Sequence, residues 1–273
     1  MVKVAMTSDN HFDVNRIDSV EMGKRQAEYL HQQQVKIYLI AGDLFNNFEN
    51  SLNYVRQLDH EVGADMQVRW IAGNHDMLNA VTYDELENLT TPTYLHNHYL
   101  DIANTKWRII GNNGWYDYSL AEETGSTDDF VKWKRAYWID GGIKQPMSDL
   151  QRMGIVLHQT GKILQDATLT DKKILFMTHF SPRKEYIQVH PEIRMWNMSN
   201  GMMGSLHLGE MLKQYHVQKV LFGHLHLHVN SRILDDTTFY NQAVGYHKKR
   251  HNEWYMDNFF DQWREQLKIV NLT

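Results

Sequence analysis

Cysteine is absent from this sequence of 273 residues, which excludes disulfide bonds and metal sites built on thiolates. Any metal ion must therefore be held by nitrogen and oxygen ligands. Such ligands are abundant, because the chain carries 16 histidines and 33 aspartates and glutamates. The composition thus leaves imidazole and carboxylate side chains as the basis for any metal site.

Long apolar runs are absent too. No stretch approaches the roughly 20 apolar residues that a membrane-spanning helix needs. The chain begins directly with a short apolar run at residues 2–6, without a recognisable signal peptide. We therefore expect a soluble, cytoplasmic protein with no membrane partner.

The sequence also lacks an excess of positive charge, since its net charge is −5. Proteins that bind nucleic acid non-specifically are usually basic, because lysine and arginine contacts to phosphate supply most of their affinity. Nucleic acid is therefore not favoured as a partner. The hydrophobic content of 42% and the charged content of 22% are ordinary for a globular protein, and the length suits one large domain covering residues 1–273.

Short apolar runs alternate with helical patterns along most of the chain. The expected strands cover residues 2–6, 35–41, 68–72, 99–102, 107–110, 173–177 and 220–222, followed by a closing hairpin at 233–240. The expected helices cover residues 17–30, 51–62, 148–164, 206–215 and 259–267. This order is typical of a layered α/β fold whose strands are buried on both faces.

The segment from about 114 to 147 interrupts the alternation, because it is rich in aromatic residues and in turn signals. We expect it to form an insertion or cap within the single domain. Two of its aromatic residues, Trp115 and Tyr116, are candidates for stacking on a substrate base. The alternative is that they are core residues beneath a small lobe.

Polar clusters follow the predicted strands. They are Asp9-Asn10-His11, Gly42-Asp43, Gly73-Asn74-His75-Asp76, His179 and Gly223-His224-Leu225-His226. Ligands of open α/β sheets gather outside the carboxyl ends of the strands. Imidazole and carboxylate groups suit zinc, iron and manganese, and a carboxylate can bridge two ions.

The spacing within two of these clusters bears on how many ions they bind. Asp9 and His11 are two residues apart on an extended segment, so their side chains can converge on one ion. His224 and His226 have the same spacing, although a turn between them would direct them to different ions. The residues alone leave both arrangements open.

The five clusters, in this order, resemble the signature of the calcineurin-like metallophosphoesterase superfamily: D-x-H, G-D, G-N-H-[DE], H and G-H-x-H. The resemblance runs from Asp9 to His226. It implies an α/β fold, namely a four-layer α/β/β/α sandwich of two mixed β-sheets flanked by helices. It also implies a hydrolase with two divalent metal ions (manganese, iron or zinc), in which a metal-bound hydroxide attacks phosphorus in line.

The resemblance further implies a ligand set and an acid. One ion would be held by Asp9, His11 and His226, the other by Asn74, His179 and His224, with Asp43 between them. His75 would stabilise or protonate the leaving oxygen, and Asp76 would orient His75 by a hydrogen bond.

Two further residues are candidates for contacts with substrate. Arg183, four residues after His179, is a candidate for pairing with a substrate phosphate, the alternative being a solvated loop arginine. His228 extends the alternation of His224 and His226, and would lie either toward the substrate or toward solvent.

Two differences from the protein serine/threonine phosphatases of the superfamily bear on the substrate class. The stretch after Asp43 lacks the arginine of the protein serine/threonine phosphatases, and Asp76 stands where a glutamate would. The Gly-Asn-His-Asp form is more similar to the phosphodiesterase and nuclease branches. Because the chain is short and acidic, we expect a small-molecule phosphodiester or phosphomonoester as substrate, with a nuclease or a non-catalytic metal-bound scaffold as alternatives. The presence of His75 favours an enzyme over a scaffold. The sequence gives no indication of the oligomeric state.

Overall fold

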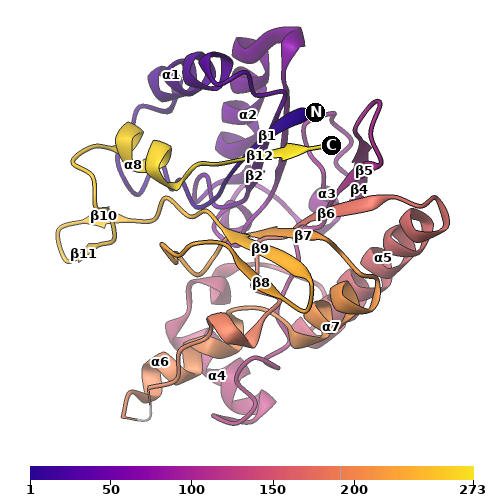
Figure 1. The fold of residues 1–273 in the computed structure, drawn as a ribbon. Helices are drawn as coiled ribbons and strands as arrows, with labels where there is room; N and C mark the ends of the chain where they lie inside the picture. The colour runs from indigo at the N-terminus through magenta and orange to yellow at the C-terminus, as the bar shows by residue number, and fades with distance from the viewer. Residues whose placement is uncertain (191) are drawn as a thin grey trace.

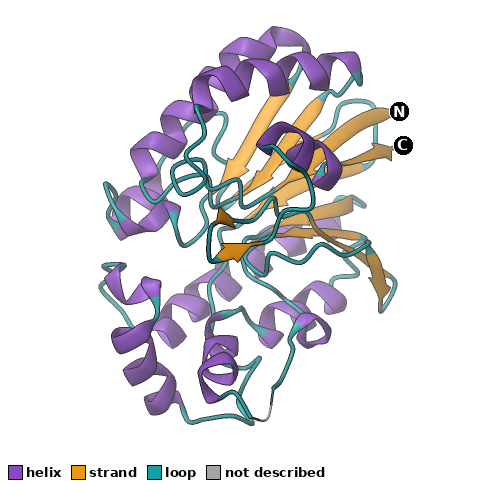
Figure 2. Cartoon of the chain, turned by 90° about the vertical axis from the view of Figure 1, so that its left-hand side faces the viewer, coloured by secondary structure: helices purple, strands orange, loops and turns teal. Residues whose placement is uncertain are grey.

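A computed structural model describes residues 1–190 and 192–273, and its core consists of two mixed β-sheets (Figures 1 and 2). The first sheet has the strand order β12-β1-β2-β3. Its strands are β1 (Val2–Thr7), β2 (Ile37–Ala41), β3 (Gln67–Ile71) and β12 (Lys268–Leu272). The strands β1, β2 and β3 run parallel, whereas the last strand of the chain pairs antiparallel with β1.

The second sheet has the strand order β4-β5-β6-β7-β9-β8. Its strands are β4 (His98–Asp101), β5 (Trp107–Gly111), β6 (Lys173–Met177), β7 (Lys219–Phe222), β8 (Arg232–Leu234) and β9 (Thr237–Asn241). The four inner strands are parallel and the two edge strands antiparallel. A separate small hairpin joins β10 (His247–Lys248) to β11 (His251–Asn252). The predicted closing hairpin is confirmed by the antiparallel pairing of β8 with β9.

The two sheets pack face to face, because alternate side chains of each strand point to opposite faces. Val4, Leu39 and Ile71 of the first sheet share one buried apolar cluster with Leu175 and Leu221 of the second. The neighbouring side chains along the strands instead join a cluster formed with the helices. The predicted four-layer α/β/β/α arrangement is thereby confirmed (Figure 2).

Helices cover both outer faces of the pair of sheets. The helices α1 (Ser19–Gln32), α2 (Phe48–Val62) and α8 (Phe259–Gln266) cover the first sheet, and α5 (Asp149–Leu169) and α7 (Leu206–Gln214) cover the second (Figure 1). Each begins at a side chain that accepts hydrogen bonds from its first backbone N–H groups, as Asp18 does for α1. No described helix is long and apolar enough to cross a membrane.

Three further helices and five 3₁₀ turns complete the described elements. They are α3 (Tyr83–Asn88), α4 (Thr127–Tyr137) and α6 (Arg194–Ser199), together with the 3₁₀ turns η1 (Gly63–Asp65), η2 (Asp76–Leu78), η3 (Ile139–Gly142), η4 (Lys184–Tyr186) and η5 (Asn200–Met202). Helices α4 and α6 contact each other at the end of the molecule remote from the first sheet (Figure 1). Because α4 and η3 lie within the aromatic-rich segment, we propose that residues 114–147 act as a cap.

A buried ion pair ties this segment to the core. The Lys134 ammonium on α4 donates to both carboxylate oxygens of Asp149 at the start of α5, at 2.7 and 2.6 Å. Trp115, Tyr118 and Gln145 also donate to this carboxylate. Burial raises the pKa of Asp149, but Lys134 and the other donors outweigh burial and lower it overall.

Replacing Asp149 with asparagine is expected to destabilise the protein by about 3 kcal/mol, because it leaves the buried Lys134 charge without a partner. Urea unfolding measures the change. The Asp171→Asn variant is the control, since its partner Lys106 and Asp171 itself are exposed, and its stability should scarcely change. Since the folded-state pKa of Asp149 lies below its usual value of 3.8, the stabilisation is present above that pH and is lost as the pH falls below it. Equal stability of both variants would contradict the role of the ion pair.

Candidate functional site

The seven residues predicted as metal ligands come together at one edge of the two sheets. Asp9 and His11 follow β1, Asp43 follows β2, Asn74 follows β3, His179 follows β6, and His224 and His226 follow β7. All seven have little exposed surface, and the two histidines after β7 are slightly more exposed than the other five. The parallel strands of both sheets thus deliver their C-terminal loops to a common site.

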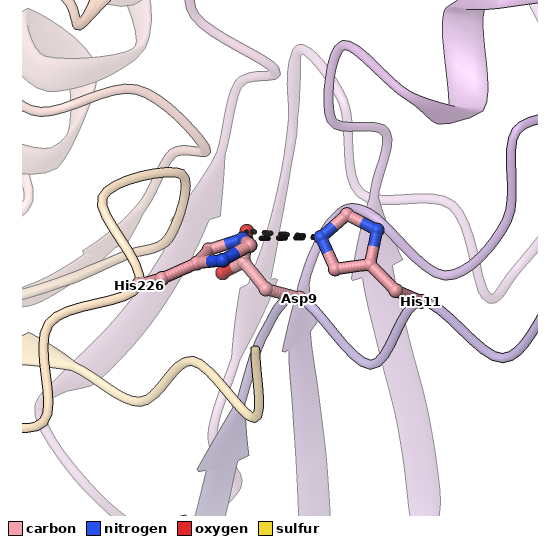
Figure 3. A group of neighbouring side chains, drawn as sticks. All are labelled: Asp9, His11 and His226. Atoms are coloured by element: carbon pink, nitrogen blue, oxygen red, sulfur yellow. Dashed lines mark hydrogen bonds and ion pairs between the residues drawn. The ribbon is translucent and has the colours of Figure 1, made fainter. Parts of the chain in front are cut away.

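The first cluster consists of Asp9, His11 and His226 (Figure 3). The Nε2 atoms of the two histidines are 3.1 Å apart, and His226 Nε2 is 3.2 Å from Asp9 Oδ1. These atoms lie close enough together to surround one ion. The arrangement also places His226 with Asp9 and apart from His224, a choice that the spacing alone leaves open.

The second cluster consists of Asp43, His179 and His224, with Asn74 beside them. His179 Nε2 is 3.3 Å from Asp43 Oδ2 and 3.0 Å from Asn74 Oδ1. The same Asp43 Oδ2 atom is 3.8 Å from His11 Nε2 of the first cluster. One carboxylate oxygen therefore lies between the two clusters, in the position that a bridging ligand requires.

The donor atoms fit divalent metal ions. His224 Nε2 is buried without a hydrogen-bond partner in residues 1–190 and 192–273. Burial, with the positive charge of His179 nearby, lowers the pKa of His224 to about 3 and keeps its ring neutral, as a metal ligand must be. An orphaned imidazole nitrogen facing carboxylates is costly unless a cation completes the site.

Two other histidines carry protons that a metal ion would displace. Burial lowers the pKa of His179, but the Asp43 carboxylate outweighs burial and raises it to about 9. Burial likewise lowers the pKa of His226, whereas Asp9 and Glu253 raise it to about 10. In the absence of cations these two rings therefore balance the buried carboxylates, and an ion that binds must replace their protons.

Backbone strain is concentrated at the same positions. Five of the seven predicted ligands have a positive φ, namely Asp9, His11, Asp43, His224 and His226. Side chains other than glycine rarely adopt this region, and such strain persists where a site requires a particular direction of the side chain. The strained loops are thus consistent with ligands aimed at a shared point.

Glycine is required where the loops approach each other most closely. A Cβ atom at Gly73 would lie 2.6 Å from the His179 ring, and one at Gly223 would lie 2.5 Å from Asp9 Oδ2. Both glycines directly precede predicted ligands. Side chains at these positions would occupy the space of the donor atoms.

The structure places His75 in the site, but its partner differs from the prediction. His75 Nδ1 contacts Asn46 Oδ1 at 2.5 Å, and His75 Nε2 contacts the Tyr246 hydroxyl at 3.1 Å. No hydrogen bond joins Asp76 to His75 among the described residues, so that prediction is wrong. At the start of η2 these two consecutive side chains have different partners.

Asp76 instead holds the loop after β2. Its carboxylate accepts hydrogen bonds from the Ser51 hydroxyl and from backbone N–H groups of Asp43, Leu44, Phe45 and Gly73. Burial and the nearby Asp43 charge raise the pKa of Asp76 to about 7, although these donors act in the opposite direction. Asp76 therefore positions the backbone that carries Asp43.

Asp140, in the predicted cap, orients the predicted ligand Asn74. Its Oδ1 accepts a hydrogen bond of 2.7 Å from Asn74 Nδ2, which leaves Asn74 Oδ1 facing His179. Its Oδ2 accepts a bond of 3.0 Å from Trp138 Nε1. The amide oxygen of Asn74 is thus fixed toward the second cluster by a residue on η3.

Replacing Asp140 with alanine is expected to weaken metal binding in the second cluster by about 10- to 100-fold, because the Asn74 amide becomes free to turn. Calorimetric titration of the metal-free protein with manganese measures the change. Asp140→Asn should have a smaller effect, since its amide oxygen can still accept from Asn74. Unchanged affinity in Asp140→Ala would show that Asn74 needs no support.

Four residues at the site were not found from the sequence: Asn46, Asp140, Tyr246 and Glu253. Glu253 Oε2 accepts from His226 Nδ1 at 2.8 Å, so it fixes the orientation of that ring. The Tyr246 ring packs 4.4 Å from the His11 ring. Only Asn46 carried a usable signal, because it follows Gly42-Asp43 by three residues. The others lie on segments without a motif.

Most of the residues predicted to contact substrate lie away from the cleft. Trp115 and Tyr116 are fully buried and stack on each other in the core, so neither can stack on a substrate base. Arg183 is paired with Glu185 and Asp235, at 3.0 and 2.9 Å, and lies outside the cleft at the metal ligands. These roles for Trp115, Tyr116 and Arg183 are wrong. His228 packs against Tyr255, with ring centroids 5.0 Å apart, and also lies outside that cleft.

A cleft of about 790 Å³ opens at the predicted metal ligands. Asp43, Asn74, His75, His224 and His226 line one end of it. The cleft is large enough to take most of a small organic molecule.

Known proteins resemble this chain in sequence pattern and in fold. The family model described as calcineurin-like phosphoesterase matches residues 2–228. A phosphopantetheinyl hydrolase from Mycobacterium tuberculosis has a similar structure, with a TM-score of 0.71 and 15% identity over 98% of this chain and 95% of the other. A dimetal phosphatase from Danio rerio has a TM-score of 0.51 and 12% identity over 88% and 86%. A search of curated proteins finds no match.

Proposed function

The chain belongs to the calcineurin-like phosphoesterase family, and from this premise we propose that it hydrolyses a small-molecule phosphodiester or phosphomonoester at a dinuclear metal centre. Metal-dependent phosphoester hydrolysis is the chemistry of the family. The observation that carries the proposal is the position of Asp43 Oδ2, 3.8 Å from His11 Nε2 and 3.3 Å from His179 Nε2. One oxygen within reach of both clusters supports two ions held side by side.

Each cluster would hold one ion. Asp9, His11 and His226 would hold the first, and Asn74, His179 and His224 the second, with Asp43 shared. When bound, two divalent ions supply Lewis acidity that polarises the phosphoester and lowers the pKa of water in the cleft.

His75 would serve as the proton donor to the leaving oxygen. The Asn46 amide oxygen at Nδ1 favours a proton on that nitrogen and fixes the orientation of the ring. Nε2 is then the atom available to the substrate. In the structure this atom faces the Tyr246 hydroxyl, so a substrate oxygen would replace that hydroxyl as its partner.

The test compares bis-p-nitrophenyl phosphate with p-nitrophenyl phosphate, with manganese and then with chelator added. We expect turnover that requires manganese and stops with chelator, and the preferred ester distinguishes a phosphodiesterase from a phosphatase. A phosphopantetheinyl ester joins the panel because a phosphopantetheinyl hydrolase covers nearly the whole chain with a similar fold. Cleavage of DNA or RNA without activity on small esters would contradict the proposal, and metal loading without any turnover would favour a scaffold.

A further inference from the structure

The cleft at the metal ligands continues into a wall of apolar side chains. We call this surface the apolar wall, and it consists of Trp133, Trp138, Ile187, Ile193, Met195 and Trp196. The first two belong to α4 and the residue that follows it, whereas the last two belong to α6. The same cleft is therefore lined both by predicted metal ligands and by an apolar surface that α4, α6 and their adjoining residues supply.

The apolar wall is unusually exposed for residues of this kind. Met195 is 64% exposed, Ile193 50% and Trp196 46%. Apolar residues gathered on an open surface usually mark a binding site, because leaving them in water forgoes the free energy of burial. Their continuity with the metal ligands indicates that the occupant is the molecule whose phosphate lies at the metals.

Hydrogen bonds hold two of the aromatic rings in place. Trp196 Nε1 donates to the Gln188 carbonyl at 2.8 Å, and Trp138 Nε1 donates to Asp140 at 3.0 Å. A preordered surface loses little entropy on binding. Met195, which lies next to Trp196, adds a flexible side chain that can adapt to the shape of a ligand.

The charges in the cleft do not suit a polyanion. Among the described residues that line it, Lys248 is the only lysine or arginine, and its ammonium lies over the Tyr246 ring at 4.3 Å. The carboxylates of Asp43 and Glu253 also line the cleft. A strand of nucleic acid needs cations along its backbone, and the apolar wall offers none. One phosphate attached to an uncharged organic group matches this distribution.

We propose that the apolar wall binds the organic group of the substrate, and that the substrate class is a phosphoester of an alcohol with a long apolar chain or ring. This inference rests on the proposed function for the place of the phosphate. It predicts that affinity and turnover increase with the apolar length of the alcohol.

The test uses n-alkylphosphonates from methyl to octyl, which carry the same headgroup and are not hydrolysed. Calorimetry with the manganese-loaded protein should give binding that tightens about two- to fourfold for each added methylene, as expected for a chain that is partly to fully buried. Trp196→Ala and Met195→Ser should flatten this dependence. Tyr255→Ala and Leu169→Ser are the matched controls, since both residues are exposed and lie outside the cleft, and both should retain it.

Two outcomes would overturn the inference. One is affinity that changes less than about twofold in total between methyl- and octylphosphonate. The other is tighter binding of a ten-residue oligothymidylate than of octylphosphonate at 0.15 M salt. Hydrolysis of the matching n-alkyl phosphates and di-n-alkyl phosphates, measured in parallel, separates this test from that of the proposed function. Chain-dependent binding without hydrolysis of either ester would support the apolar wall and contradict the proposed hydrolase. Hydrolysis of one of them, with neither affinity nor rate depending on chain length, would support the hydrolase and contradict the role of the apolar wall.

Discussion

Replacing Asp43 with asparagine is expected to remove both metal ions together and to lower turnover at least about 10³-fold. Loss of a single electrostatic stabiliser in an active site already costs about 10²- to 10³-fold. Asp43 Oδ2 lies within 4 Å of a histidine in each cluster, so one substitution affects both. The neutral amide removes the charge that the two ions share. Elemental analysis of the purified variant measures its metal content.

The Asp9→Asn variant is the matched control, because Asp9 lies in the first cluster alone. It should lose one ion and retain the other. The backbone N–H of His75 donates to Asp43 Oδ1 at 2.9 Å, so circular dichroism must show that both variants remain folded. Two ions per chain in Asp43→Asn would contradict its shared position, and so would the loss of only one.

Replacing His75 with alanine is expected to leave the metal content unchanged and to lower the turnover of alkyl esters by about 10²- to 10⁴-fold, the usual contribution of a general acid. An alkoxide needs a proton to leave. A p-nitrophenolate leaves without one, so p-nitrophenyl esters should lose far less. The ratio of the two effects, measured as kcat on both types of ester, reports proton donation and not binding.

Asn46→Ala is the companion variant, since Asn46 contacts His75 Nδ1 and is not a predicted ligand. Asn46→Ala should also lower kcat more for alkyl esters than for p-nitrophenyl esters, but by a smaller factor than His75→Ala. Tyr246→Phe removes the hydroxyl that faces His75 Nε2 and tests whether substrate must displace it. Equal losses on alkyl and p-nitrophenyl esters in His75→Ala would argue against an acid role.

Much of the fold could be predicted from the sequence because the strands are short apolar runs with polar residues directly after them. Since parallel strands end at a common edge, the ends of these runs were enough to bring Asp9, Asp43, Asn74 and His179 together. The final strand, β12, was missed because Lys268–Leu272 follows an amphipathic helix without a turn signal. Its place beside β1 depends on a contact between the two ends of the chain.

The errors concern contacts that no local pattern encodes. The sequence does not distinguish aromatic residues that line a cleft from those that fill a core. Trp115 and Tyr116 are core residues, whereas Trp133 and Trp138 line the cleft, and no local pattern separates the two pairs. Arg183 has two carboxylate partners, of which Asp235 lies 52 residues away and Glu185, two residues further on, belongs to no motif.

The supporting residues were missed for the same reason. Glu253 reaches His226 from a loop 27 residues further on, and Asp140 reaches Asn74 across 66 residues. Such partners are determined by how the loops meet in the folded chain. The sequence motifs identified the side chains that would bind metal, whereas the structure revealed the residues that orient those side chains.

We propose that these seven residues hold two metal ions and that phosphoester hydrolysis depends on both. Titration of the metal-free protein with manganese, followed by turnover of bis-p-nitrophenyl phosphate and by bound metal in the same samples, tests it most directly. We expect activity that reaches its maximum at two ions per chain and disappears with chelator. Turnover that persists without metal would contradict it, as would a maximum at one ion per chain.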